Sequence, residues 1–234
     1  MKAYLTKKII LLLLIFAFVI NMMFAQNGER LFTQSFDKEN CTFLTTGRNK
    51  YFILEPGYEL VLEGLKGQDK ERLVITVLNE TKKINNIETR IVEEHESING
   101  EVVEISKNFF AICKQTGSIF YFGEEVDIYK NGKIVSHSGA WIAEGNNKAG
   151  IIIPGQVLIG SRYYQEIAPK IAMDRAEIIS NTETQTTKAG QFANVLKIEE
   201  TTPLEPLDIA HKLYAPEVGL IKDGDLWLIK YGFK

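Results

Sequence analysis

The sequence predicts a mainly β protein: a single antiparallel curved sheet, shaped as a half-barrel or barrel-like meander, with at most one short helix. Alternating apolar and polar residues recur from residue 51 to the end of the chain. Asn-Gly pairs at 99–100 and 131–132 each separate two such runs, and this pair is the strongest short hairpin signal. Two other runs, NFFAIC and SIFYFG, are apolar on both faces, which is typical of strands buried between layers or against the inside of a barrel.

Residues 1–25 are expected to form a signal peptide. A basic start, MKAYLTKK, precedes the uninterrupted apolar run Ile9–Ile20. That run has 12 residues, whereas a membrane-spanning helix needs roughly 20. Ala25 offers a small residue for cleavage, and no cysteine follows the run to carry a lipid. We therefore expect a periplasmic or secreted protein that is soluble and not membrane-integral.

Removing Lys2, Lys7 and Lys8 with the signal peptide leaves 24 basic residues against 30 acidic ones, a net charge of 24 − 30 = −6. A mildly acidic chain has no long-range attraction for nucleic acid, so no nucleic-acid partner is expected.

Residues 26–50 are mixed and polar and predict an irregular N-terminal arm, whereas residues 51–234 predict a single β domain. The stretch YFILEPGYELVLEG gives an extended run, a turn at Pro56-Gly57 and a second strand. The best helix candidate is QEIAPKIAMDRAEIIS at 165–180, which Pro169 interrupts.

Two cysteines, Cys41 and Cys113, remain in the mature chain. An exported protein meets an oxidising environment, so they are able to form a disulfide, which would close a loop of 113 − 41 = 72 residues. The alternative is two separate buried thiols that behave as small apolar residues. Spacing alone leaves both readings open.

The stretch HKLYAPEVGLIKDGDL at 211–226 also has two readings. Pro216 and Gly219 predict a turn and Asp223-Gly224 a last hairpin turn, so the stretch reads first as a sheet corner. The alternative is a functional role for His211, Lys212 and Tyr214 at the mouth of a cavity.

Polar clusters on two hairpins are candidates for chemistry. If the Asn99-Gly100 turn has two residues, His95 lies opposite Glu104, and the structural reading is a solvated pair on a strand face. The same count at Asn131-Gly132 places His137 and Asp127 on opposite faces, which weakens any Asp–His dyad. The sequence contains no G-x-S-x-G, H-E-x-x-H, Cys-x-x-Cys or phosphate-loop pattern, so no cofactor is indicated and a non-enzymatic protein is favoured.

Several motifs together form a family pattern. The opening YFILEPGYELVLEG and the closing HKLYAPEVGLIK resemble exported bacterial proteins of uncharacterised function with a YFxLxPG…EG opening and a KxYAPxVGL closing motif. The segments YFGEE, SGAW, GIIIPGQVLIGSRYYQE and FANVLKIEETTPLEP follow in the same order. More distantly, the layout resembles LolA-like lipoprotein carriers. That resemblance implies a half-barrel around an apolar cavity and, with it, an apolar ligand.

Three functions are compatible with these observations. The first is an exported non-enzymatic β domain that binds an apolar ligand or a partner protein on its concave face. The ligand-binding residues predicted for it are aromatic side chains beside Gly or Pro near strand ends: Trp141, Tyr163, Tyr164 and Tyr214. The second is a metal-binding or hydrolytic protein whose site is assembled from separate strands by Glu124, Asp127, Glu166 and His211 or His137. The third is a structural component of a surface assembly, which would carry an exposed apolar patch.

Overall fold

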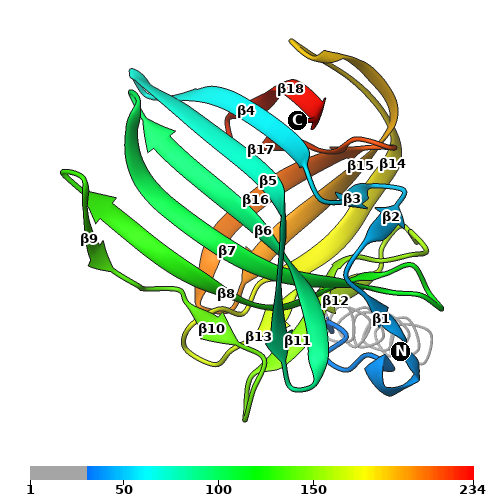
Figure 1. Cartoon of the computed structure of the whole chain (residues 1–234). Helices are drawn as coiled ribbons and strands as arrows, with labels where there is room; N and C mark the ends of the chain where they lie inside the picture. The colour runs from blue at the N-terminus through cyan, green and yellow to red at the C-terminus, as the bar shows by residue number, and fades with distance from the viewer. Residues whose placement is uncertain (1–30) are drawn as a thin grey trace, which may run out of the picture. The chain divides into compact units, whose positions relative to one another are not determined.

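The structure is a computed structural model that describes residues 31–234, of which residues 32–234 form one compact unit. The predicted signal peptide and its cleavage site lie outside the described residues. Nearly every element of the compact unit is a strand (Figure 1), which confirms the predicted mainly β fold. The strands are β1 (Phe43–Leu44), β2 (Gly47–Asn49), β3 (Phe52–Leu54), β4 (Tyr58–Lys66), β5 (Asp69–Ile84), β6 (Ile87–Ile98), β7 (Glu101–Cys113), β8 (Ile119–Lys130), β9 (Lys133–Ser136), β10 (Trp141–Ile142), β11 (Lys148–Ile153), β12 (Arg162–Tyr164), β13 (Glu166–Ile167), β14 (Arg175–Thr187), β15 (Gly190–Thr202), β16 (Glu205–Ala215), β17 (Gly219–Asp223) and β18 (Leu226–Phe233).

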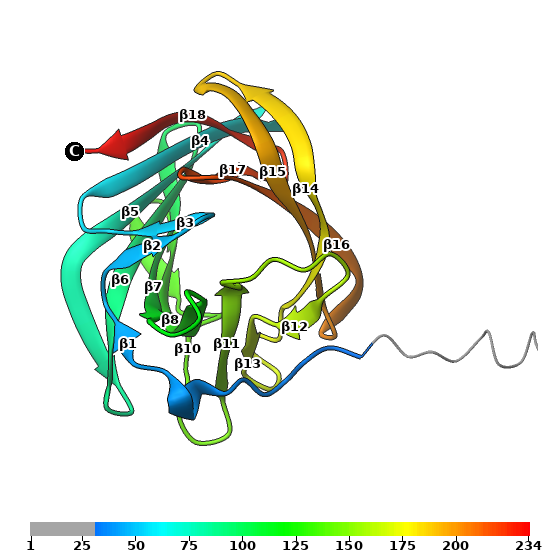
Figure 2. The ribbon, with the colours of Figure 1, turned by 90° about the vertical axis from the view of Figure 1, so that its right-hand side faces the viewer.

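One large antiparallel sheet contains most of these strands. Its order is β12-β14-β15-β16-β17-β18-β4-β5-β6-β7-β8-β11-β13, with β1 paired to β7 and both β9 and β10 paired to β8. Consecutive strands mostly pair as neighbours, because short hairpin turns connect them. Viewed from the side in Figure 2, the strands curve into a ring. The predicted curved, barrel-like sheet is therefore present.

The segment from Arg162 to Ile167 brings the two edges of this sheet together. Its first half, β12, pairs with β14 at one edge, and its second half, β13, pairs with β11 at the other. Between them, the backbone N–H of Gln165 donates to the carbonyl of Asp174 at 2.8 Å. Because one short segment pairs with both edges, the sheet is nearly closed into a barrel.

The best helix candidate, residues 165–180, does not form a helix, which agrees with the prediction of at most one short helix. The segment begins as β13 and ends in β14, with a turn between them. Pro169 prevents a continuous helix, and in β14 the buried Ala176 and Ile178 alternate with half-buried neighbours, which is strand periodicity. The one helical element of the described residues is a short 3-10 turn, η1 (Lys38–Asn40).

A small second sheet, the β2–β3 hairpin, lies within the ring of strands in Figure 2. Phe52 packs edge-on against Phe110 of β7, with ring centroids 5.3 Å apart. The carbonyl of Lys50, in the hairpin turn, accepts a hydrogen bond from the N–H of Glu217 at 2.7 Å. Since β7 and Glu217 belong to different parts of the ring, the hairpin spans the interior between them.

The runs predicted to be buried on both faces are β7 and β8. Phe110 and Tyr121 face the interior, whereas Phe120 and Phe122 point the other way and are 3% and 2% exposed. Phe43 of β1 covers them, with its ring edge-on to both at 5.2 Å. The inside of the barrel buries one face of these strands and the N-terminal arm buries the other.

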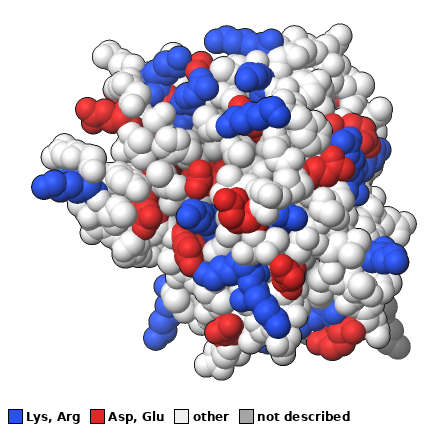
Figure 3. Space-filling model, viewed as in Figure 1, with Lys and Arg blue, Asp and Glu red and all other residues white. Residues whose placement is uncertain are grey.

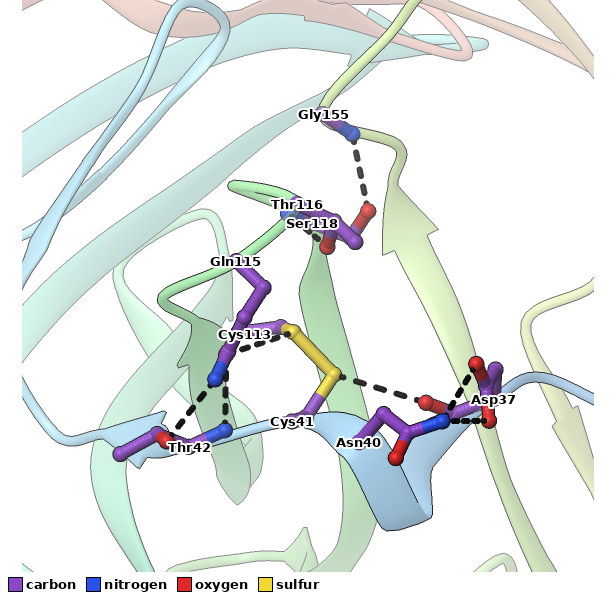
Figure 4. The surroundings of a disulfide bond; sticks show 9 residues. All are labelled: Asp37, Asn40, Cys41, Thr42, Cys113, Gln115, Thr116, Ser118 and Gly155. Carbon is purple, nitrogen blue, oxygen red and sulfur yellow. Dashed lines mark hydrogen bonds between the residues drawn. A yellow bond between two sulfur atoms is a disulfide. The ribbon is translucent and has the colours of Figure 1, made fainter.

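Cys41 and Cys113 form a disulfide that fixes this arm to β7 (Figure 4). Beside it, the side chain of Gln115 accepts a hydrogen bond from the N–H of Thr42 at 2.8 Å and donates to its hydroxyl at 2.9 Å. The described part of the arm, expected to be irregular, is therefore held to the barrel by β1, the disulfide and these hydrogen bonds.

The surface has no area of one charge on the face shown in Figure 3, where acidic and basic side chains are interspersed. Among the described residues, no helix combines the length and the apolar character needed to cross a bilayer.

Candidate functional site

A cavity of about 240 Å³ lies inside the barrel. Its size is somewhat below the roughly 300–1,000 Å³ of sites for drug-sized ligands, so it suits a small molecule. The lining residues are Phe52, Ile53, Tyr58, Leu60, Ile75, Val77, Val92, Glu94, Asn108, Phe110, Tyr121, Glu124, Ile152, Gln165, Glu166, Ala172, Asp174, Glu200, Lys212, Tyr214, Val218, Gly219, Leu220 and Asp223.

Strand alternation decides which side chains reach this cavity. Glu94 of β6 lies opposite Ile75 on β5 and Ser106 on β7, and residues directly opposite each other in a sheet share a face. Glu94 therefore shares the inner face with Ile75, whereas Glu93 and His95 point outward. A polar residue enters the interior wherever the alternation places it on that face.

One side of the lining is apolar. It combines Phe52 and Ile53 of the β2–β3 hairpin with side chains of β4, β5 and β7, among them Leu60, Val77 and Phe110. The ring of Phe110 stacks on that of Tyr121 at 4.9 Å. This surface offers hydrophobic and aromatic contact to a ligand.

The remaining lining is polar and contains a partly buried ion-pair group. The Nζ of Lys212 lies 3.1 Å from Glu200 and 3.5 Å from Asp223, on the two strands that flank β16. Burial acts to lower the pKa of Lys212, but the two carboxylates outweigh it and hold the pKa well above its ordinary value. Lys212 is therefore a cation at neutral pH, and its charge is shared between two carboxylates.

The segment Arg162–Ile167, which pairs with both edges of the sheet, is called the closing segment below. Glu166 of this segment and the nearby Asp174 both line the cavity. Glu166 is 3% exposed and accepts a hydrogen bond from the backbone N–H of Asp174 at 2.5 Å. Burial raises the pKa of both carboxyl groups, that of Glu166 strongly, and their mutual repulsion adds to the shift at Glu166. The neighbouring Gln165 amide donates to Glu200 at 2.8 Å and so joins this pair to the Lys212 group.

Glu94 and Glu124 complete the polar lining. Burial raises the pKa of Glu94 to about 8 and that of Glu124 to about 7. Repulsion from other carboxylates adds to both shifts and Lys212 opposes them; at Glu124 the interaction with the Tyr121 hydroxyl opposes the raised pKa more strongly. Near Glu124, the Tyr121 hydroxyl donates to the Asn108 side-chain oxygen at 2.7 Å. Both carboxyl groups thus exchange protons close to neutral pH.

Tyr214, one of the four aromatic residues predicted to bind the ligand, lines the cavity. It is 5% exposed, and within the described part of the chain its hydroxyl has no hydrogen-bond partner. The hydroxyl oxygen is not one of the fully enclosed polar atoms that lack a partner, so it is open to the cavity. A ligand atom in the cavity could supply a hydrogen bond to it.

The other three predicted aromatic residues are buried but do not line the cavity. Trp141 packs edge-on against Tyr121 at 5.2 Å, directly behind the lining. Tyr163 donates to the carbonyl of Ile152 at 3.4 Å, and Tyr164 packs against Phe32 at 6.2 Å. Trp141 supports the lining from behind, and Tyr163 and Tyr164 belong to the segment Arg162–Ile167 that closes the sheet.

The predicted metal or hydrolytic set does not gather in one place. Glu124 and Glu166 face the cavity, whereas Asp127, an odd number of residues after Glu124, points outward and lies 2.9 Å from His137. His211 likewise points outward, 3.3 Å from Glu199 on the neighbouring strand. Among residues 31–234, no three His, Cys, Asp or Glu side chains are grouped as a metal ion would require.

Two predicted hairpin registers were wrong by one residue, although both turns are correct. Asn99-Gly100 and Asn131-Gly132 have the positive φ angles of two-residue hairpin turns. A β-bulge beyond each turn then shifts the pairing, so His95 faces Ile105 instead of Glu104. On the second hairpin the bulge brings His137 onto the same face as Asp127. One extra residue reverses the face of everything that follows it.

Most of the polar lining was not predicted from the sequence. Lys212 was considered with Tyr214 as part of a cavity mouth, but its partners Glu200 and Asp223 were not, nor were Glu94 and Asp174. A signal was available at β16, because HKLYA places Lys212 and Tyr214 on one face and Tyr214 was already expected to face inward. No comparable local pattern marks Asp174, which follows a turn.

Comparisons with protein-family models, with curated proteins and with solved structures find no match to this chain. The resemblance to exported bacterial proteins and to LolA-like carriers stays a prediction, and a functional conclusion depends on the site itself.

Proposed function

We propose that this protein is a non-enzymatic binding protein that holds a small amphipathic molecule inside its barrel. The observation that carries the proposal is the interior cavity, which combines an apolar, partly aromatic side with polar groups at fixed positions. Cavities of this composition are where small ligands bind, because apolar contact supplies affinity and a few polar groups set orientation.

The sequence favoured an apolar ligand, and the lining favours a refinement of that expectation. Phe52, Leu60 and Phe110 would contact an apolar part of the molecule. Glu94, Tyr214 and the groups around them would bind a polar end. A purely apolar ligand would bury these polar groups without partners, which costs free energy.

We propose further that the protein acts in the periplasm or outside the cell. The basic start and the apolar run Ile9–Ile20 support export. The Cys41–Cys113 disulfide supports it independently, because such bonds persist in oxidising compartments. Fractionation of cells that express the full chain, followed by N-terminal sequencing, tests this: we expect the exported form to begin after residue 25.

Native mass spectrometry with organic extraction tests the binding function. Protein purified from its own periplasm or medium should carry a small molecule of defined mass. The variant Ile75→Phe enlarges a side chain that lines the cavity and should lose this mass, whereas Val74→Phe, on the outer face of the same strand, should keep it. Circular dichroism verifies that both variants fold. A folded wild-type protein that carries no ligand, together with no change on titration of small amphipathic compounds, contradicts the proposal.

A further inference from the structure

The cavity contains more acidic groups than its own basic groups can neutralise. Six of its lining residues are acidic and one, Lys212, is basic. Lys212 forms ion pairs with Glu200 and Asp223. Within the described part of the chain, the other four, Glu94, Glu124, Glu166 and Asp174, have no basic side chain at ion-pair distance. Carboxylates that line one cavity stabilise a cation that enters it.

Glu94 shows how these charges converge from several strands. The charged groups that act on it are Glu96 on its own strand, Glu124 on β8, Lys212 on β16 and Asp223 on β17. Three of these four are acidic. Lys212 is the strongest of the four and opposes the shift, but it is also shared between Glu200 and Asp223, and the pKa of Glu94 stays raised.

A second, independent observation is the hydroxyl of Tyr214, which is open to the cavity. It lies in the same lining, on the same strand face as Lys212, and is 5% exposed without a hydrogen-bond partner in the described part of the chain. A tyrosine oxygen accepts hydrogen bonds from an N–H group. The cavity thus combines carboxyl groups that lack a basic partner with a tyrosine hydroxyl that is open to it.

The arrangement favours an organic cation over a bare metal ion. Divalent metals need several ligand atoms grouped around one point. Within residues 31–234, no group of three potential metal ligands is present. An ammonium group on a stem can instead contact carboxylates spread along the lining, and the apolar side of the cavity can contact the stem.

We infer that the ligand is a small primary amine on an apolar or aromatic stem. Its ammonium group would lie among Glu94, Glu124 and Tyr214, and its stem would lie against Leu60, Phe52 and Phe110. This inference rests on the proposed binding function and specifies the class of ligand.

Binding of such an amine should depend on pH. Burial raises the pKa of Glu94 to about 8 and that of Glu124 to about 7. Below those values the carboxyl groups hold protons, and an incoming ammonium group must displace them. We therefore expect the affinity to increase as the pH rises from 6 to 8.5.

Calorimetric titration with three matched probes tests the inference. The probes are 2-phenylethylamine, 2-phenylethanol and 3-phenylpropanoate, which share an aromatic stem and differ in charge. The purified protein is first dialysed at pH 5 to release any resident cation. At pH 8.5 the amine should bind at least tenfold more tightly than the alcohol, and the carboxylate should not bind. The affinity for the amine should fall at least threefold at pH 6.

Paired variants separate the cavity carboxylates from surface charge. Glu94→Gln and Glu124→Gln should each weaken amine binding at least tenfold. Glu93→Gln and Glu125→Gln change the outward-facing neighbours on the same two strands and should have no effect.

The outcomes distinguish the two proposals. Equal binding of amine and alcohol, or amine binding that persists in the Glu94→Gln and Glu124→Gln variants, overturns the amine inference and leaves the binding function intact. Failure of all three probes also overturns the amine inference. In that case the mass of molecules extracted from the purified protein decides the binding function separately.

Discussion

Inside the barrel, the Nζ of Lys212 on β16 lies 3.1 Å from a carboxylate oxygen of Glu200 on the adjacent strand β15. Asp223, on the strand at the other side of β16, lies 3.5 Å from the same nitrogen. A side chain normally found at the surface thus links three strands from within. Its charge determines whether the neighbouring carboxylates can remain ionised.

Replacing Lys212 with methionine is expected to destabilise the protein by about 2 kcal/mol at pH 8, because its loss leaves two partly buried carboxylates without their partner. The loss should be smaller at pH 5, where the carboxyl groups of the cavity can take up protons. Urea denaturation at both pH values measures it. Lys197→Met is the matched control, since this lysine forms no ion pair with the described residues and its loss should change stability by less than about 0.5 kcal/mol. An equal loss in the two variants would contradict the role of the ion pair.

The raised carboxyl pKa values predict that the protein becomes less stable as the pH rises. Burial raises the pKa of Glu94 to about 8, and those of Glu96 and Glu124 to about 7, in the folded protein. In the unfolded chain a glutamate has a pKa of about 4.3. Between these values the folded state binds more protons, so the stability contributed by protonation is complete below about pH 4 and is lost as the pH approaches 8.

Urea denaturation at pH 5, 6, 7 and 8.5, with ligand removed, tests this dependence. We expect the free energy of unfolding to decrease across the series, and to decrease less in Glu94→Gln. Glu63 acts in the opposite sense, because the hydrogen bonds from Lys70 and Arg72 overcome its burial and lower its pKa. Its effect lies at more acidic pH, outside this series. Stability that is constant or increases from pH 5 to 8.5 would show that the interior carboxyl groups are not shifted upward.

Features that depend on neighbouring residues in the sequence were predicted well, whereas features that depend on distant residues were not. Asn99-Gly100 and Asn131-Gly132 are local signals, because their conformation requires positive φ at both residues, and both turns were correctly predicted. Asn85-Asn86 forms a third hairpin turn that the sequence did not suggest, since asparagine alone adopts positive φ less readily than glycine. The sequence carries no local signal for the β-bulges beyond the two Asn-Gly turns. Each bulge therefore made the predicted position of a histidine, relative to the opposite strand, wrong by one residue.

The interior site was harder to predict because its position also depends on contacts between distant parts of the chain. Glu94, Glu200 and Asp223 are ordinary charged residues in alternating runs, and such positions usually face solvent. They become buried because the sheet closes on itself through β12 and β13, which is a long-range event. The sequence did place Tyr214 on the inner face, because an aromatic residue in an alternating strand usually faces the interior, and it lines the cavity.

Loss of the Cys41–Cys113 disulfide should lower the free energy of unfolding by about 4 kcal/mol, since it closes a loop of 72 residues. Thermal unfolding of the double variant Cys41→Ser, Cys113→Ser measures the effect. The arm should also detach from β7, so the near-ultraviolet circular dichroism of the aromatic cluster around Phe43 should change. The single variant Thr46→Ser, at an exposed position of the same arm, should leave both signals unchanged. Wild-type stability in the double variant would mean that the arm is held by β1 and its aromatic contacts alone.

Because the closing segment packs directly against Gly150, any larger residue at this position should destabilise the protein. A Cβ atom at this position would lie 2.3 Å from the carbonyl oxygen of Tyr164 and 2.4 Å from that of Gln165, both in the closing segment. These are backbone atoms, so the clash cannot be relieved by rotating a side chain. Gly150→Ala should therefore cost at least about 2 kcal/mol, and it should weaken ligand binding, because Gln165 and Glu166 line the cavity. Lys148→Ala, on the same strand but exposed, is the control for strand propensity. Chemical denaturation and the calorimetric titration together provide the test, and a Gly150→Ala protein with unchanged stability would show that the sheet does not close through this segment.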